Sequence, residues 1–293
     1  MSALVLPRRR LDSRPDDLVW DDGRLMIKQS FAELFDGHSL TSFSSLMNQP
    51  ELASAKAARK DRLTYRFELS TPAGVRVFYL KWHGRAPWKD YVKPWLQGKT
   101  AIVGAWNEWQ AMHHFEAAGV SSMKPVAYGE HHAESFVIIE GLEGYTKLSD
   151  LLKRHPASAF YQPAIWELVD SLAVLTARMH GANLHHQDYY LGHVMVKSCY
   201  ENCLLGTAPI TRSPDLRIID LGRAQKQNHL ARRWIVKDLA QLDYSGRDCP
   251  QEWRSQFWET YCRSRNEADE TGLRKAVESK AVRIASHSRK HKI

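Results

Sequence analysis

The segment "NLHHQDYYLGHVMVK", residues 183–197, places Asp188 and His193 between a long apolar helical pattern and a short run of strand-forming residues. A carboxylate held between two regular elements can accept a proton from a hydroxyl group or orient that group. A single aspartate in a tyrosine-rich loop is also a common turn residue. The catalytic interpretation of Asp188 therefore depends on partners elsewhere in the chain.

A second carboxylate, Asp220, ends the strand-like run "LRIID" and is followed by a Leu-Gly pair. A carboxylate at a strand end suits a hard cation such as Mg²⁺, although an aspartate there can also cap the turn. We predict that Asp220 binds metal. His193 is a weaker candidate ligand because Mg²⁺ prefers oxygen to imidazole nitrogen, so metal ligation, a hydrogen bond to phosphate and bracing of the loop all stay open for it.

A lysine and a glutamate complete the set of charged candidates. Lys81 follows Phe-Tyr-Leu in an alternating strand pattern, and Glu108 falls in the first turn of an expected helix. Alone, the first could be a solvated strand-edge lysine and the second a glutamate that favours the helix dipole. Together with the "HQD" loop and Asp220, they occur along the chain in the order that protein-kinase-type phosphotransferases require of these charged residues.

In such enzymes each group has a defined task. The strand lysine neutralises nucleotide phosphates and is held by the helix glutamate, the loop aspartate receives the acceptor hydroxyl, and the strand-end aspartate holds Mg²⁺. Phosphoryl transfer is mostly positioning and charge neutralisation, so these few groups suffice. We therefore predict ATP and Mg²⁺ as cofactors, with Lys81 and Glu108 in the nucleotide site and Asp188 as the base.

The elements that must position these residues can be read from periodicity. Alternation from Arg62 to Lys81 around the turn "TPAG" predicts a β-hairpin, and "NEWQAMHHFEAAGV" predicts a helix that ends at Gly119. The run "SFVIIE" predicts a buried strand followed by a glycine-containing hinge. At that hinge we expect Glu140 and Leu142 to contact the nucleotide.

The second half of the chain is expected to be mainly helical. Apolar residues repeat on one face of residues 163–180, with Pro163 near the start and Gly181 just past the end. The "HQD" loop, two short strands and a helical remainder from about Arg232 follow it. We expect His185 and His186 to support the loop through hydrogen bonds to the backbone.

Composition limits the class of protein and its partners. The 293 residues, 43% hydrophobic and 25% charged, can form one large domain or two lobes. The opening residues do not have the order of a secretory signal, and no apolar run approaches the roughly 18 residues of a membrane span. Four cysteines indicate neither a disulfide framework nor a zinc site. We therefore expect a cytoplasmic protein.

The net charge of +8 favours anionic partners. Phosphorylated glycans, an acidic carrier protein and the inner face of a membrane are all compatible with it, and we expect no nucleic-acid partner. Among the basic stretches, Arg232 and Arg233 are our better candidates for contacts with lipid and core phosphates. We expect most of the ten tryptophans to pack in the interior.

Three segments, "LHHQDYYLGHVMV", "RIIDLGRAQ" and "ARRWIVKDLAQLDYS", resemble the family of lipopolysaccharide core heptose and Kdo kinases. Further similarity in "FYLKWH", "VGAWNEWQAMHHFEAAGVSSMKPVAYGE" and "SFVIIEGL" extends the resemblance over residues 77–245 in family order. A histidine at the position of His193 is usual in that family. Two departures are the lack of a G-x-G-x-x-G run before Lys81, which leaves the turn "STPAGV" as the phosphate cover, and Gly222, where the family commonly has a larger residue.

The resemblance implies a two-lobed α+β protein-kinase-like fold. Residues 1–140 would form an N-terminal lobe with an antiparallel sheet and one helix, and residues 141–293 a mainly helical C-terminal lobe with the catalytic loop. The implied reaction is phosphorylation of a heptose or Kdo hydroxyl of the lipopolysaccharide inner core, with a core or lipid A precursor as partner. Peripheral contact with the inner membrane would follow.

Two other functions fit the same motifs. A small-molecule phosphotransferase of the antibiotic or choline kind shares an H-x-D loop, but "KDLAQLDYS" argues against it. A pseudokinase that binds an acidic partner is disfavoured because all four charged positions are retained. A substrate panel and an ATP-binding assay would separate these functions.

Overall fold

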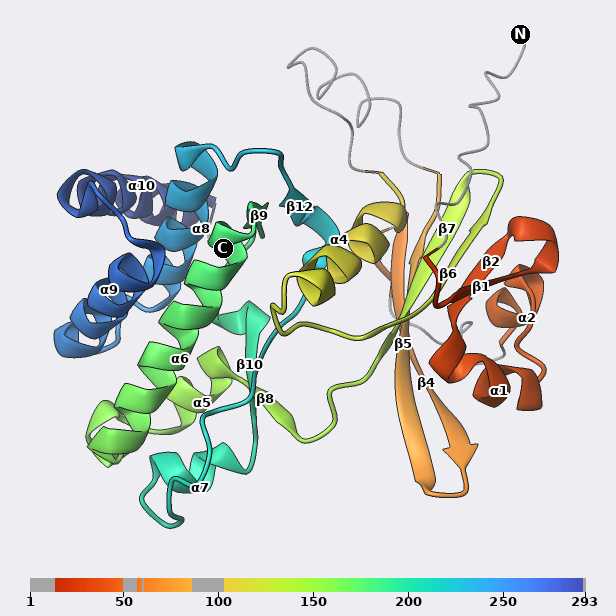
Figure 1. Cartoon of the computed structure of the whole chain (residues 1–293), viewed down its shortest axis with the longest axis horizontal. Coiled ribbons are helices and arrows are strands. Elements are labelled where there is room, and N and C mark those ends of the chain that lie inside the picture. Colours follow the sequence, from red (N-terminus) through yellow and green to blue (C-terminus); the bar gives the residue numbers. More distant parts are fainter. Residues whose placement is uncertain (1–13, 50–56, 60, 86–102, 292–293) are drawn as a thin grey trace, which may run out of the picture. The chain divides into compact units, whose positions relative to one another are not determined.

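A computed structural model describes residues 14–49, 57–59, 61–85 and 103–291 (Figure 1). Contacts divide the chain into two units, each with its own hydrophobic core. The first comprises residues 1–106 and 125–141, and the second comprises residues 107–124 and 142–293. Sequence analysis placed residues 107–124 in the N-terminal lobe, whereas their contacts group them with the second unit.

The first unit is built on a seven-stranded antiparallel sheet with the strand order β1-β2-β6-β7-β5-β4-β3. Its longest pair, β4 and β5, is the hairpin that the alternating pattern predicted, with the turn at Pro72 and Ala73. The strands are β1 Asp17–Trp20, β2 Leu25–Lys28, β3 Ala57–Arg59, β4 Arg62–Thr71, β5 Gly74–His83, β6 Pro125–His131 and β7 Glu134–Glu140.

Lys81 lies in β5, between β4 and β7, where it is paired with Thr64 and Val137. The interpretation of Lys81 as a strand-edge lysine is therefore wrong. Because side chains alternate along a strand, Lys81 lies on the face opposite Phe78 and Leu80, which are buried in the core.

Two helices, α1 Gln29–Gly37 and α2 Phe43–Met47, contribute to the core of this unit. Phe31 and Phe35 of α1 pack edge-on against Phe78, with ring centroids 6.0 and 5.4 Å apart. The sequence predicted one helix for this lobe and assigned no element before Arg62. The short N-terminal strands and helices were thus missed, because each is too brief to show a clear period.

The second unit is mainly helical, as predicted. None of the helices in the described ranges has the length and hydrophobicity that a membrane span needs. The helices of the second unit are α4 Trp106–Ala117, α5 Leu148–Arg154, α6 Gln162–Gly181, α7 Tyr200–Leu204, α8 Arg232–Ser245, α9 Gln251–Arg265 and α10 Glu270–His291. Of α4, residues 107–117 belong to this unit.

Helix α6 confirms the helix predicted for residues 163–180, although Gly181 is its last residue and does not lie past its end. Its small residues Ala173 and Ala177, one turn apart, are buried in a core shared with α8, α9 and α10. Small side chains at this spacing allow neighbouring helices to approach closely. The other members of this core include Ile235, Leu239, Trp258, Tyr261, Leu273 and Val277.

Short strands align the loops that carry the candidate residues. In one sheet β10 Val194–Lys197 pairs with β8 Tyr145–Lys147 and β11 Leu216–Ile218. In a second sheet β9 Leu184–His185 pairs with β12 Gln225–Lys226. The segment before the "HQD" loop is thereby hydrogen-bonded to the segment after "DLGRA", which brings the two motifs together.

Candidate active site

The "HQD" loop is held by a buried carboxylate that sequence analysis did not single out. Asp238 of α8 accepts the backbone N–H of His186 at 2.7 Å and that of Gln187 at 2.8 Å. Because Asp188 is the next residue, these two bonds fix the backbone from which its side chain projects.

The same face of α8 binds the rest of the loop. Gln241 Oε1 accepts the N–H of Tyr189 at 3.0 Å, and Ser245 Oγ accepts the N–H of Leu191 at 2.9 Å. Positions 238, 241 and 245 lie three and four residues apart, so their side chains share one side of the helix. The two remaining amides of residues 186–191 are bonded within the loop. Every backbone donor of this buried loop therefore has an acceptor.

The groups around the Asp238 carboxyl favour its ionised form. Burial alone would raise its pKa, but the nearby ring of His180, the ring of His186 and the backbone N–H of His186 lower the pKa of Asp238 below its ordinary value. The His180 ring nitrogen is 3.5 Å away, so the shorter amide bonds are the stronger contacts. Because the pKa is depressed in the folded state, the stabilisation is present above the ordinary aspartate range and is lost as the pH falls toward the folded-state pKa.

His186 links the loop to the strand that leads to Asp220. Its Nε2–H donates to the carbonyl of Ile219 at 2.9 Å, and its Nδ1 accepts the N–H of Asp188 at 3.2 Å. This pattern requires the neutral ring, and burial lowers the pKa of His186 accordingly. The supporting role that we predicted for this histidine is confirmed by these contacts.

Asp188 itself contacts a cation from the neighbouring motif. Arg223 donates from Nη1 to Asp188 Oδ1 and Oδ2 at 3.1 and 3.2 Å. The Gln187 side chain in turn donates to the carbonyl of Arg223 at 2.9 Å. The arginine that follows "DLG" is thus adjacent to the predicted base, a contact that the sequence did not reveal.

Asp220 follows β11 in the left-handed backbone region, with φ 60° and ψ 59°. Few non-glycine residues adopt this conformation, and those that do often lie at functional sites. Its Oδ2 is 3.7 Å from Nε2 of His193. The other ring nitrogen, Nδ1, donates to the carbonyl of Asp188 at 2.6 Å, so in the neutral ring Nε2 carries a lone pair near the carboxylate.

The Asp220 carboxylate and His193 Nε2 are both acceptors, and at this separation they can face one cation. Mg²⁺ is usually held by one or two carboxylates together with substrate phosphates and water. The described residues contain no group of three or more His, Cys, Asp or Glu placed to hold a metal. Asp220 with His193 therefore fits a partial site, to which phosphate oxygens would add ligands.

Glu108 is buried in α4 and lies near the same motif. Its neighbour Asn107 donates to the carbonyls of Gly222 and Ala224, each at 3.0 Å. A Cβ at Gly222 would lie 3.7 Å from Glu108 Oε2 and 3.9 Å from Asp220 Oδ1. The glycine is not sterically required, but it leaves open the space beside both carboxylates.

The remaining predicted residues are not all in this unit. Lys81 and Glu140 belong to the first unit, and the carboxylate of Glu140 accepts hydrogen bonds from Arg76. Leu142 begins the second segment of the second unit, half-buried. The second unit brings together Glu108, Asp188, His193 and Asp220. The pairing of Lys81 with Glu108, and the nucleotide contacts of Glu140 and Leu142, stay predictions.

A family model described as the lipopolysaccharide kinase (Kdo/WaaP) family matches residues 55–261. The chain belongs to this family. The resemblance and the fold class inferred from the sequence motifs are thereby confirmed.

Among the relatives, a lipopolysaccharide core heptose(I) kinase WaaP of Pseudomonas aeruginosa is 30% identical over 284 residues, covering 92% of this chain and 98% of the relative. A protein of the same name from Escherichia coli K12 is 31% identical over 192 residues, or 63% of this chain and 67% of the relative. A solved structure, "WaaP in complex with acyl carrier protein", is 26% identical with a TM-score of 0.63 and covers 89% of this chain and 98% of that one.

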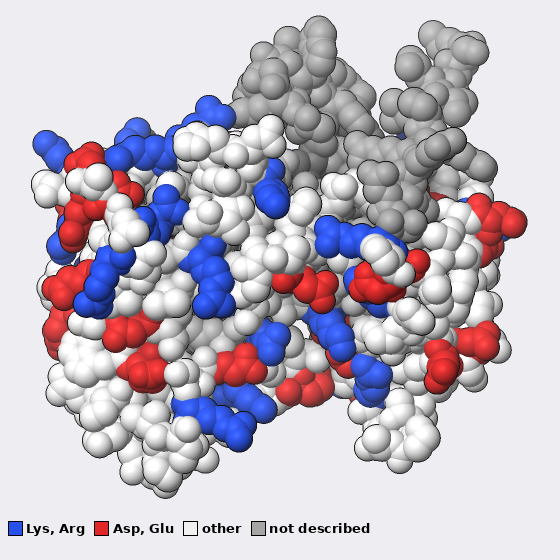
Figure 2. Space-filling model, viewed as in Figure 1, with Lys and Arg blue, Asp and Glu red and all other residues white. Residues whose placement is uncertain are grey.

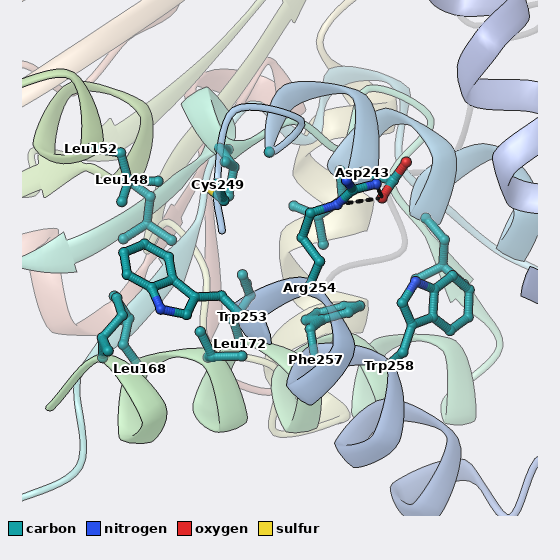
Figure 3. A pocket seen from close by; sticks show the side chains of 16 residues that line it. Leu148, Leu152, Leu168, Leu172, Asp243, Cys249, Trp253, Arg254, Phe257 and Trp258 are labelled. Carbon is teal, nitrogen blue, oxygen red and sulfur yellow. Dashed lines mark hydrogen bonds and ion pairs between the residues drawn. The ribbon is translucent and has the colours of Figure 1, made fainter. Parts of the chain in front are cut away.

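Within this family member, an apolar pocket lies beside the loop (Figure 3). Trp253 and Phe257 of α9 point into it, opposite leucines of α5 and α6, and the Asp243–Arg254 ion pair borders it. Its cavity volume is about 100 Å³, smaller than the roughly 300–1,000 Å³ of drug-sized ligand sites. Leu191 and Leu239 also line it, so the pocket shares a wall with the "HQD" loop and α8.

The residues that sequence analysis missed are Asp238, Gln241, Ser245 and Arg223. One signal for Asp238 was present: it lies among the apolar residues of "WIVKDLAQL", where a solvated aspartate is not expected. Nothing in the sequence identifies backbone amides as its partners. Arg223 was within a quoted motif, but its pairing with Asp188 depends on the three-dimensional fold.

His193 provides a test of the metal site. We predict that His193→Ala lowers Mg²⁺-dependent phosphate transfer by roughly 10- to 100-fold, the usual cost of removing a group that ligates or orients at a metal site. His193→Asn should retain measurable activity, because an amide oxygen can replace the lost acceptor. Transfer rates are measured as a function of Mg²⁺ concentration. Near-normal, equal activity in both variants would reduce His193 to a support for the Asp188 carbonyl.

Proposed function

We propose that this chain transfers the terminal phosphate of ATP to a heptose hydroxyl of the lipopolysaccharide inner core. The observation that most supports it is the joint positioning of Asp188, His193 and Asp220 in a member of the lipopolysaccharide kinase family. Heptose is favoured over Kdo because the relatives are named heptose(I) kinases. Since such an acceptor is attached to lipid, the reaction would take place at the surface of the inner membrane.

Asp188 would act as the general base. Its backbone is fixed by Asp238 and His186, so its carboxylate projects from a rigid support. Arg223 contacts both carboxylate oxygens through one nitrogen, which leaves its remaining N–H groups for an incoming anionic group. A sugar hydroxyl that hydrogen-bonds to Asp188 would lose its proton to this carboxylate as its oxygen bonds to phosphorus and the bond from phosphorus to the departing ADP breaks.

The nucleotide and metal would be held by the other predicted residues. We assign Asp220 and His193 to Mg²⁺, Lys81 to the nucleotide phosphates, Glu108 to the support of Lys81, and the hinge at Glu140 and Leu142 to the nucleotide base. Bound Mg²⁺-ATP would supply the phosphoryl group and neutralise its developing charge.

The two rival functions are disfavoured on different grounds. Family membership over most of the chain counts against a small-molecule phosphotransferase. A pseudokinase is disfavoured by the contact network around Asp188, in which every backbone N–H of the loop donates a hydrogen bond.

Replacing Asp188 tests the assigned reaction. Asp188→Asn keeps the size of the side chain but removes the charge that accepts a proton. We predict near-normal ATP affinity and a fall in phosphate transfer on the order of 10²-fold or more. ATP binding is measured on purified protein, and transfer is measured by mass spectrometry of core oligosaccharide from a strain that lacks the gene.

The matched control is Asp248→Asn, since Asp248 is an exposed aspartate of the same unit with a side chain that is 89% accessible. This variant should phosphorylate the core as the wild type does. A fully phosphorylated core with Asp188→Asn, at ordinary expression, would show that Asp188 is not the base.

We further propose that an acyl carrier protein binds this chain and that its acyl group enters the apolar pocket. A solved relative is described as a complex with acyl carrier protein, and the net charge of +8 is complementary to an acidic carrier. The pocket has an almost wholly apolar lining that includes Leu172, Trp253 and Phe257, which suits a hydrocarbon chain.

The pocket assignment predicts that acylated carrier protein binds more tightly than the unacylated form. Leu172→Phe should fill part of the pocket and weaken binding of the acylated form on the order of 10-fold, because the added ring takes space that the acyl group would occupy. The control, Val174→Phe, adds the same ring at an exposed site of α6 that is 39% accessible. Affinities are measured by titration with purified carrier protein. Equal affinity of the wild type for both forms would contradict the pocket assignment.

A further inference from the structure

Two basic side chains of α8 share one aromatic ring. The Arg233 guanidinium lies 5.1 Å from the ring centre of Trp234, and Lys237 Nζ lies 5.8 Å from it. Among the residues that the structure describes, neither cation has an acidic group within 4.0 Å. A cation–π contact is weaker than a desolvated ion pair can be.

The adjacent arginine behaves differently. Arg232 pairs with Asp269 at 2.9 Å and with Glu267 at 3.7 Å. Sequence analysis grouped Arg232 and Arg233 as candidates for contacts with anionic lipid or core groups. The structure separates them, because Arg232 joins α8 to the start of α10 whereas Arg233 has no acidic partner in the described part of the chain.

The shared ring lies against the catalytic segment. Trp234 stacks on His185, with the ring centroids 4.5 Å apart and the planes 9° from parallel. Lys237 immediately precedes Asp238, which accepts the backbone N–H groups of His186 and Gln187. The cations of α8 are thus on the helix that supports Asp188, close to the loop itself.

The electrostatic environment of Lys237 supports this placement. Partial burial lowers the pKa of the Lys237 ammonium, and the positive charges of Arg223 and Lys280 lower it further, while Asp188 and Asp238 act in the opposite sense. A partly dehydrated cation beside another cation is unfavourable unless an anion compensates it. Figure 2 shows Lys and Arg side chains gathered over the part of the second unit that contains α8 and α10.

We propose that Arg223, Arg233 and Lys237 form a cationic acceptor subsite beside Asp188. It would bind an anionic group, a carboxylate or a phosphate, carried by a sugar next to the one whose hydroxyl is phosphorylated. This inference rests on the proposed function and adds to it a requirement for negative charge in the acceptor. The planar guanidinium groups suit both anions, because each presents paired N–H donors.

Kinetics with modified acceptors test the subsite. Three core oligosaccharides are compared: the native acceptor, one with its carboxylates reduced to alcohols, and one with its phosphates removed. With the native acceptor, Lys237→Gln and Arg233→Gln should each raise the acceptor KM about tenfold, as loss of one charge-assisted contact implies. The KM for ATP should stay at the wild-type value. Lys237→Arg, which keeps the charge, should retain most of the affinity and shows that folding is intact.

The control is Lys275→Gln, which removes one charge from an exposed position of α10 and should leave the acceptor KM unchanged. If the effect of Lys237→Gln disappears with the reduced acceptor, the bound anion is a carboxylate. If it disappears with the dephosphorylated acceptor, the anion is a phosphate.

Wild-type acceptor KM in both Lys237→Gln and Arg233→Gln would overturn the subsite while leaving the proposed function intact. A mutational effect that is undiminished with both the reduced acceptor and the dephosphorylated acceptor would also overturn it. Failure of the wild type to phosphorylate any core acceptor would instead overturn the proposed function, and the subsite with it.

Discussion

A single buried carboxylate orders the second unit around the candidate active site. Asp238 is fully buried, and two consecutive backbone amides satisfy its charge. A buried charge is strongly unfavourable without such partners, so the helix and the loop stabilise one another. Gln241 and Ser245 extend the contact along the same helical face, while Leu239 and Leu242 of α8 line the apolar pocket. One helix therefore supports the "HQD" loop on one side and lines an apolar pocket on another.

The two functional motifs are joined by hydrogen bonds that leave little independent freedom to either. His186 connects the Asp188 amide to the carbonyl before Asp220, and Gln187 binds the carbonyl of Arg223, whose guanidinium returns to Asp188. Neutral His186 can act as donor and acceptor at once, which a charged ring could not. A displacement of either motif would therefore move the other, which explains how a loop and a strand end keep the geometry that phosphoryl transfer needs.

Local patterns in the sequence predicted the parts of this structure whose causes are local. Alternation predicted the hairpin that carries Lys81, and capping residues with apolar periodicity predicted α6. The short "HQD" and "DLG" motifs identified the carboxylates that the fold brings together. Asp238 was missed because its partners are backbone amides some fifty positions earlier in the chain. Every residue except proline carries such an amide, so the sequence does not single these two out. Arg223 was missed for a similar reason, since only the fold brings its side chain to Asp188.

The central claim is that Asp238 positions Asp188 for phosphate transfer, and the single-turnover transfer rate of Asp238→Asn tests it most directly. An asparagine keeps the size of the side chain but offers one oxygen and a donor group, so it cannot accept both loop amides. We predict a folded protein that binds ATP with near-normal affinity and transfers phosphate on the order of 10²-fold more slowly, the cost of a small misplacement at the reacting centre. A folded Asp238→Asn protein that transfers phosphate at the wild-type rate would contradict the account.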